Sequence, residues 1–105
     1  DWEYQMTKNP VEIFKDFFLD IEYSVPTKDE TPFLVYRGKG STNLNAEDQV
    51  YYADYDYTIE YYFKYKNEEY ERRIEARLNE VGVGWYKSGD IYIEEEGMFV
   101  IYYSI

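Results

Sequence analysis

Apolar and polar residues alternate along the middle of the chain, from residue 51 to residue 65 (YYADYDYTIEYYFKY). All odd positions of this segment are aromatic or apolar, and most even positions are polar. Because side chains of a β-strand point alternately to its two faces, the pattern predicts one long strand with an aromatic face and a charged face. At roughly 3.3 Å per residue the strand would span about 50 Å, so we expect a bend, a bulge or a protruding end.

The polar face of this strand carries Asp54, Asp56, Thr58 and Glu60. These oxygen side chains could bind a divalent cation, but calcium sites usually draw their ligands from loops. The same alternation predicts a solvated sheet face, which we adopt. Tyrosines interrupt the polar row near both ends, at residues 52 and 62, where we expect the strand to leave the core or to meet a partner.

Two segments carry the signals of an α-helix. Asn9 and Pro10, with a Glu two residues later, form a helix-start signal, and apolar residues follow at spacings of three and four. This predicts a helix over residues 10–21 with a buried stripe. Asn67 and Gly82 bracket a second helix over residues 67–81. The two expected stripes are Phe14, Phe17, Phe18 and Ile21, and Tyr70, Ile74, Leu78 and Val81.

Shorter apolar runs predict the other strands. One covers residues 33–37, and two more, residues 84–87 and 90–94, lie on either side of a Ser-Gly turn. The last covers residues 98–105, which are nearly all apolar, so we expect this strand to be buried on both faces. Residues 38–49 are rich in turn-forming residues and predict a loop. Its GKGST sequence lacks the full spacing of a phosphate-binding loop, so nucleotide binding is not expected.

This order of elements predicts a single α+β domain over residues 1–105. Its antiparallel-rich sheet would have one long central strand, with two helices packed on the sheet. Residues 1–8 show no clear period and fit either an arm that docks on a neighbour or a frayed end.

The amino-acid composition excludes several kinds of catalytic and metal-binding site. The 105 residues include neither Cys nor His, which excludes disulfides, zinc sites, thiol nucleophiles and histidine acid-base catalysis. No nucleophile, base and oxyanion donors can be assembled from the remaining residue types, so we expect no enzyme, no metal and no cofactor. There is no apolar run of about 18 residues and no leader, and we expect a soluble protein of intracellular origin.

Charge and aromatic content point toward protein contacts. The net charge of −11 disfavours direct nucleic-acid binding, because phosphate recognition needs a basic face. It fits a basic protein partner, a DNA mimic, or a surface that must not adhere to passing DNA. Fifteen tyrosines are more than one small core needs, and Tyr favours sites where its ring is buried and its hydroxyl group contacts water. We therefore expect some tyrosines in subunit contacts.

The order and spacing of most of the chain resemble the small tail-completion, or tail-terminator, proteins of phages and prophages of Gram-positive bacteria. After an opening helix, the matching segments are residues 32–36 (PFLVY), 46–65, 67–78 and 85–105, the last running from a Trp to a tyrosine-rich end. The family often has a polar strand end where residues 62–64 are YFK, and residues 1–5 have no counterpart in it.

The resemblance implies a structural virion protein of the tail or neck, present in the host cytoplasm during assembly. Such proteins form a ring, commonly a hexamer, on the tail tube protein, end tube growth and join the tail to the head connector or stopper protein, while DNA crosses the lumen without specific binding. Candidate subunit contacts are Tyr51, Tyr52, Tyr62, Tyr65, Tyr102 and Tyr103. Candidate lumen-facing or partner-facing acids are Glu47, Asp48, Glu94, Glu95 and Glu96.

Two other functions are also compatible with the sequence. An acidic inhibitor that mimics DNA and binds a host nuclease or defence protein would also explain the charge. Another neck or tail-ring component of similar fold would share the same pattern.

Overall fold

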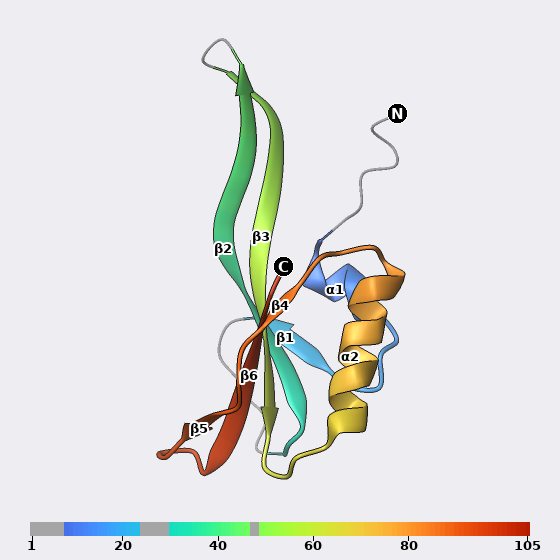
Figure 1. Ribbon diagram of the computed structural model, residues 1–105, viewed down its shortest axis with the longest axis vertical. Coiled ribbons are helices and arrows are strands. Elements are labelled where there is room, and N and C mark those ends of the chain that lie inside the picture. Colours follow the sequence, from blue (N-terminus) through green and yellow to red (C-terminus); the bar gives the residue numbers. More distant parts are fainter. Residues whose placement is uncertain (1–7, 24–29, 47–48) are drawn as a thin grey trace.

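A six-stranded sheet forms the centre of the molecule, and its longest strand lies in the middle (Figure 1). The computed structural model describes residues 8–23, 30–46 and 49–105, and for residues 42–46 and 49–54 it describes the backbone only. The elements are α1 (Pro10–Ile13), β1 (Ile21–Tyr23), β2 (Phe33–Ala46), β3 (Gln49–Phe63), α2 (Glu68–Glu80), β4 (Tyr86–Lys87), β5 (Ile91–Ile93) and β6 (Met98–Ser104).

The sheet confirms the predicted α+β class. The strand order is β1-β2-β3-β6-β4, and β5 also pairs with β6. Strands β1 and β2 are parallel, whereas the other pairs are antiparallel. Strand β3 begins and ends two residues before the predicted bounds of 51–65. The central position of the long strand is therefore as expected.

The predicted loop over residues 38–49 is wrong, because β2 continues through it to Ala46 and pairs with β3 as far as Gln49. Glycines that suggested a turn instead accompany a β-bulge, in which the pairing register shifts between Gly38 and Gly40. Gly40 has φ +105°, a conformation that other residues rarely adopt. A second irregularity lies between Leu44 and Asn45.

Beyond the body of the sheet, β2 and β3 continue as a two-stranded ribbon, defined here as residues 38–46 and 49–57. The ribbon projects from the rest of the molecule and accounts for its elongated shape of 50 × 26 × 23 Å (Figure 1). The expected protruding end of the long strand is thus present, together with the expected bulge.

The predicted helix over residues 10–21 is also wrong, because α1 has only four residues. Its start is as predicted, since the Asn9 side chain accepts a hydrogen bond from the Val11 amide at 2.9 Å. The chain then turns through Asp16, which has φ +58°, and Ile21 joins the sheet in β1. The aromatic residues after α1 pack in a compact turn, with the ring centres of Phe14 and Phe17 5.0 Å apart. Their spacing of three and four residues, which suggested the buried stripe of a helix, instead belongs to this turn.

Helix α2 confirms the second prediction. The Asn67 side chain accepts a hydrogen bond from the Tyr70 amide at 3.2 Å, and Gly82 follows the helix with φ +75°. Ile74 and Leu78 are fully buried against the sheet. Local capping signals therefore determine both ends of this helix.

Both faces of the sheet bury apolar side chains. The larger cluster lies under the helices and includes Ile13, Ile59 and Leu78, while a smaller cluster on the opposite face includes Val35 and Val100. Strand β6 contributes to both clusters, as predicted for a strand covered on both faces.

Candidate functional site

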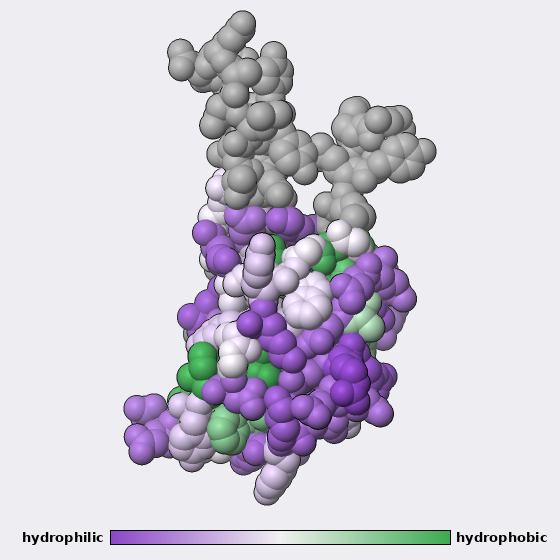
Figure 2. All heavy atoms as spheres, viewed as in Figure 1, coloured by the Kyte–Doolittle hydropathy of each residue, from purple (hydrophilic) through white to green (hydrophobic). Residues whose placement is uncertain are grey.

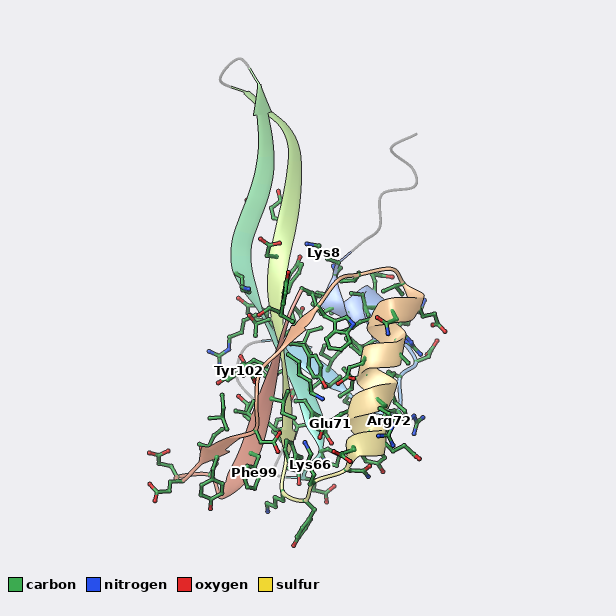
Figure 3. All side chains as sticks on the ribbon, viewed as in Figure 1. Lys8, Lys66, Glu71, Arg72, Phe99 and Tyr102 are labelled. Carbon is green, nitrogen blue, oxygen red and sulfur yellow. The ribbon has the colours of Figure 1, made fainter. Side chains whose placement is uncertain are left out.

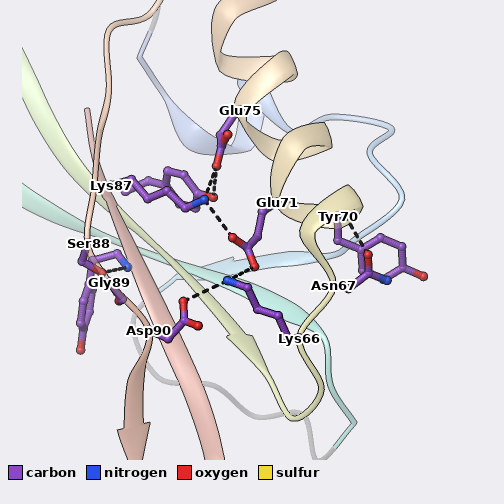
Figure 4. A network of polar contacts seen from close by, with 11 residues as sticks. Lys66, Asn67, Tyr70, Glu71, Glu75, Lys87, Ser88, Gly89 and Asp90 are labelled. Carbon is purple, nitrogen blue, oxygen red and sulfur yellow. Dashed lines mark hydrogen bonds and ion pairs between the residues drawn. The ribbon is translucent and has the colours of Figure 1, made fainter.

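A buried carboxylate, Glu71, is the centre of a polar network between α2 and the sheet (Figure 4). Its Oε2 lies 2.7 Å from Lys66 Nζ, and its Oε1 accepts a hydrogen bond from Lys87 Nζ at 2.8 Å. In Figure 3, Glu71 extends toward Lys66, whereas the neighbouring Arg72 extends away from the sheet. Two cations thus compensate a charge that would be costly to bury alone.

The network continues on both sides of Glu71. Lys87 Nζ lies 2.7 Å from Glu75 Oε2, and the Tyr103 hydroxyl donates a hydrogen bond to the same oxygen at 2.7 Å. On the other side, Lys66 Nζ lies 3.1 Å from Asp90 Oδ1. These contacts join α2 to β4, to β6 and to the segment before β5.

The environment changes the proton affinities in this network. Burial alone would lower the pKa of the Lys66 and Lys87 ammonium groups, but their carboxylate partners outweigh burial and raise it. The pKa of the Tyr103 hydroxyl is raised, first by burial and then by its bond to Glu75. Both lysines therefore remain charged, and the tyrosine neutral, well into the alkaline range.

A second buried carboxylate, Glu60, lies on the opposite face of the sheet. Its Oε1 accepts a hydrogen bond from the Tyr62 hydroxyl at 2.5 Å, and its Oε2 lies 3.1 Å from Arg37 Nε. Burial and the contact with Glu60 raise the pKa of Tyr62. The prediction of a solvated polar face is wrong for Glu60, because the second apolar cluster covers this part of β3.

The aspartates of the predicted polar row on β3 are not buried like Glu60 where their side chains are described. Asp56 is partly exposed and lies 3.1 Å from Lys8 Nζ, and the side chain of Asp54 lies outside the described residues. Within the described ranges, no group of three or more acidic side chains is arranged to hold a metal ion.

The candidate interface tyrosines fall into three groups. Tyr65 is exposed, and Tyr102 is half-buried against the second cluster. Tyr103 and Tyr62 are buried in this chain and bond to its own glutamates, so their side chains are not at the surface for a subunit contact. The side chains of the remaining two candidates, Tyr51 and Tyr52, lie outside the described residues.

The candidate acids come from two distant places. Glu94, Glu95 and Glu96 are exposed in the turn between β5 and β6, which we call the acidic turn. Glu47 and Asp48 lie outside the described residues. The acidic turn lies at the opposite end of the molecule from the far end of the ribbon (Figure 1).

A groove lies at the base of the ribbon and has a volume of about 540 Å³. Its described lining, which defines the ribbon-base groove, is Lys8, Lys39, Asp56, Gly84, Trp85, Tyr86, Ser104 and Ile105. Lys8 reaches the groove beside β3 (Figure 3). The groove combines cationic side chains with an exposed aromatic ring, which suits a protein contact.

Sequence reasoning missed both buried glutamates, although the pattern contained a signal for each. Glu71 precedes Ile74 by three residues and Leu78 by seven, so it shares the buried stripe of α2. Glu60 is two residues before Tyr62, which interrupts the polar row where the second cluster begins. In both cases an apolar neighbour on the same face indicated burial.

Comparison of the chain with protein-family models, with curated proteins and with solved structures gives no match. None of the helices in the described ranges is long and apolar enough to cross a membrane.

Proposed function

We propose that this chain is a structural protein that assembles with copies of itself into a ring at the head-proximal end of a phage tail tube. The ring would end tube growth and join the tail to the head connector. The proposal starts from the sequence resemblance of most of the chain, from Met6 onward, to tail-completion proteins. The protruding ribbon is the structural observation that supports it best.

Among the described residues, the outer part of the ribbon pairs only with itself, β2 against β3. Its described residues 38–41 are all exposed, and the backbone pairing of β3 with the C-terminal segment ends at Tyr57, which exchanges two hydrogen bonds with Ile105. A two-stranded ribbon alone is marginally stable in water, and unpaired strand edges invite pairing with another chain. An element of this kind is best explained by a neighbour that packs against it.

The exposed tyrosines agree with an assembly role. Tyr65 and Tyr86 are 86% and 82% exposed, and Tyr23 and Tyr55 are also largely exposed. Tyrosine is enriched at protein interfaces because its ring supplies apolar area and its hydroxyl remains hydrogen-bonded. These side chains would be among the first to become buried in a ring.

The charge agrees with a ring through which DNA passes. A net charge of −11 would repel the phosphate backbone and keep DNA from adhering to the lumen. Figure 2 shows polar side chains over most of the described surface on one face, including α2. The alternative of a DNA mimic has less support, because the exposed acids of the described residues are spread over the segment from α1 to β1, over α2 and over the distant acidic turn rather than collected in one segment.

Deletion of the gene from the phage or prophage that encodes the chain tests this function. Electron micrographs of the lysate are expected to show unjoined heads beside tails of irregular or excessive length. Normal, joined particles would overturn the proposed function.

A shortened ribbon tests the structural observation in the same assay. Replacement of residues 43–53 by Asn-Gly would join Thr42 to Asp54, which face each other in the ladder, through a two-residue turn. This variant is expected to fold but not to restore joined particles when supplied in trans. The matched control, Glu69→Gln on the exposed side of α2, is expected to restore them fully.

A further inference from the structure

We propose that the ribbon-base groove of one copy receives the acidic turn of the next copy, in a head-to-tail contact. This inference rests on the proposed ring assembly and specifies its subunit interface.

The groove presents positive charge on a strongly acidic chain. Lys39 is exposed, and among the described residues it forms no ion pair. The other lysine of the groove, Lys8, is neutralised by Asp56 at 3.1 Å. Lys39 therefore gives the described lining a positive charge that no described carboxylate side chain neutralises, whereas the whole chain carries −11.

The acidic turn presents the opposite charge on a rigid projection. The amides of Glu96 and Gly97 both donate hydrogen bonds to the Ile93 carbonyl, at 3.2 and 2.9 Å, and Gly97 adopts φ +63°. Its three carboxylates are exposed, and none forms an ion pair within the described residues. At the lower left of Figure 2 the turn forms a polar knob.

Apolar side chains accompany the charges on both surfaces. Ile91 and Tyr92, just before the turn, are 43% and 55% exposed. On the groove, Tyr86 is exposed and Trp85 is partly buried. A contact between them would place an ion pair beside buried aromatic area, the usual composition of a specific interface.

The positions of the two surfaces determine the symmetry of the contact. The groove lies at the base of the ribbon, and the acidic turn lies beyond the far end of β5 and β6 (Figure 1). A contact between two different surfaces is head-to-tail, and such contacts close into rings when the rotation between copies permits. A match of opposite charges is also needed to bring together copies that otherwise repel each other.

Two charge-reversal variants test the contact. One is Lys39→Glu, which makes the groove acidic, and the other combines Glu94→Lys, Glu95→Lys and Glu96→Lys, which makes the turn basic. Each variant alone would place like charges in every contact, so its self-association is expected to weaken about tenfold. An equal mixture would alternate matched contacts and is expected to recover assembly to within about twofold of the wild type.

Assembly would be measured by sedimentation over a series of concentrations, after circular dichroism shows that both variants fold. The matched control mixes Lys39→Glu with Glu68→Lys/Glu69→Lys, which reverses exposed charges on α2 and should not restore assembly. If both variants assemble like the wild type, or the mixture does not recover, the contact is overturned while the deletion test still decides the proposed function. A wild-type chain that remains monomeric throughout would also overturn the contact.

Discussion

The same two strands, β2 and β3, behave differently in the body of the sheet and in the ribbon. In the body, Ile59 and Tyr61 have no exposed surface, because both lie in the larger apolar cluster under the helices. In the ribbon, only four residues before Ile59, Tyr55 is 62% exposed. One continuous ladder therefore contributes stability where it is covered and offers a surface where it is not.

Different forces hold the two regions. Burial contributes roughly 25 cal/mol per Å² of apolar surface, and among the described side chains the buried apolar residues lie in the body. In the ribbon the described contacts are chiefly the backbone pairing of β2 with β3, in which each hydrogen bond contributes about 1 kcal/mol or less. We therefore expect the ribbon to open locally at a lower free energy than the whole domain.

The largest expected effect is a difference in the free energy of unfolding between substitutions in the body and in the ribbon part of β3. Ile59→Ala would remove buried methyl groups and leave a cavity, and is expected to lower the free energy of unfolding by about 2–5 kcal/mol. Tyr55→Ala, on the same strand, should change it by no more than about 0.5 kcal/mol. Urea unfolding followed by circular dichroism measures both. Equal losses would contradict the division between body and ribbon.

Alkaline pH is expected to destabilise the body. Burial, aided by nearby carboxylates, raises the pKa of Tyr61, Tyr62 and Tyr103, and the contacts of Lys66 and Lys87 raise theirs. The unfolded chain would release these protons near pH 10.0–10.5 while the folded chain retains them. Stability is thus complete below about pH 10 and falls above it, by up to about 1.4 kcal/mol per pH unit for each buried tyrosine and by less for the two lysines, whose charges solvent screens.

Urea unfolding at pH 8, 9, 10 and 11 would measure this dependence. Tyr103→Phe serves as the matched variant, because it removes one titrating group and should make the alkaline slope shallower. A free energy of unfolding that stays constant up to pH 11 would contradict the prediction.

A smaller loss of stability is expected when Glu71, the central residue of the buried polar network, loses its charge. Glu71→Gln would leave Lys66 and Lys87 without their shared carboxylate and is expected to cost about 1–3 kcal/mol, since both lysines can still reach water. The control Glu69→Gln, on the exposed side of α2, should be nearly neutral. Thermal unfolding of the two variants tests the difference, and equal melting temperatures would mean that the network adds no net stability.

The smallest global effect is expected at the bulge of the ribbon. Gly40→Ala meets no steric obstacle but forces alanine into φ +105°, which should cost about 1 kcal/mol locally. Amide hydrogen exchange is expected to accelerate in the ribbon and remain unchanged in Ile74 and Leu78 of α2. Faster exchange in α2 as well would show that the ribbon and the body unfold as one unit.

Local patterns in the sequence determined much of this fold. Asn67 and Gly82 mark the ends of α2, the alternation of residues 51–65 locates β3 to within two residues, and the apolar residues 98–105 predict a doubly covered strand. These features depend on caps and periodicity, which are set by residues close together in the chain. For the candidate site, the exposed position of the acidic turn was also predictable.

Other features were decided only by the tertiary structure. Strand β2 reaches Ala46 because β3 provides a backbone partner. Helix α1 stops at Ile13, and the chain turns through Asp16 before Ile21 pairs with β2. Glu60 and Glu71 are buried because Arg37 and Lys87, distant in sequence, compensate their charges. Local apolar neighbours could indicate that these two glutamates are buried, but strand pairing and the cations that compensate the buried charges depend on residues far apart in the chain, which no local pattern identifies.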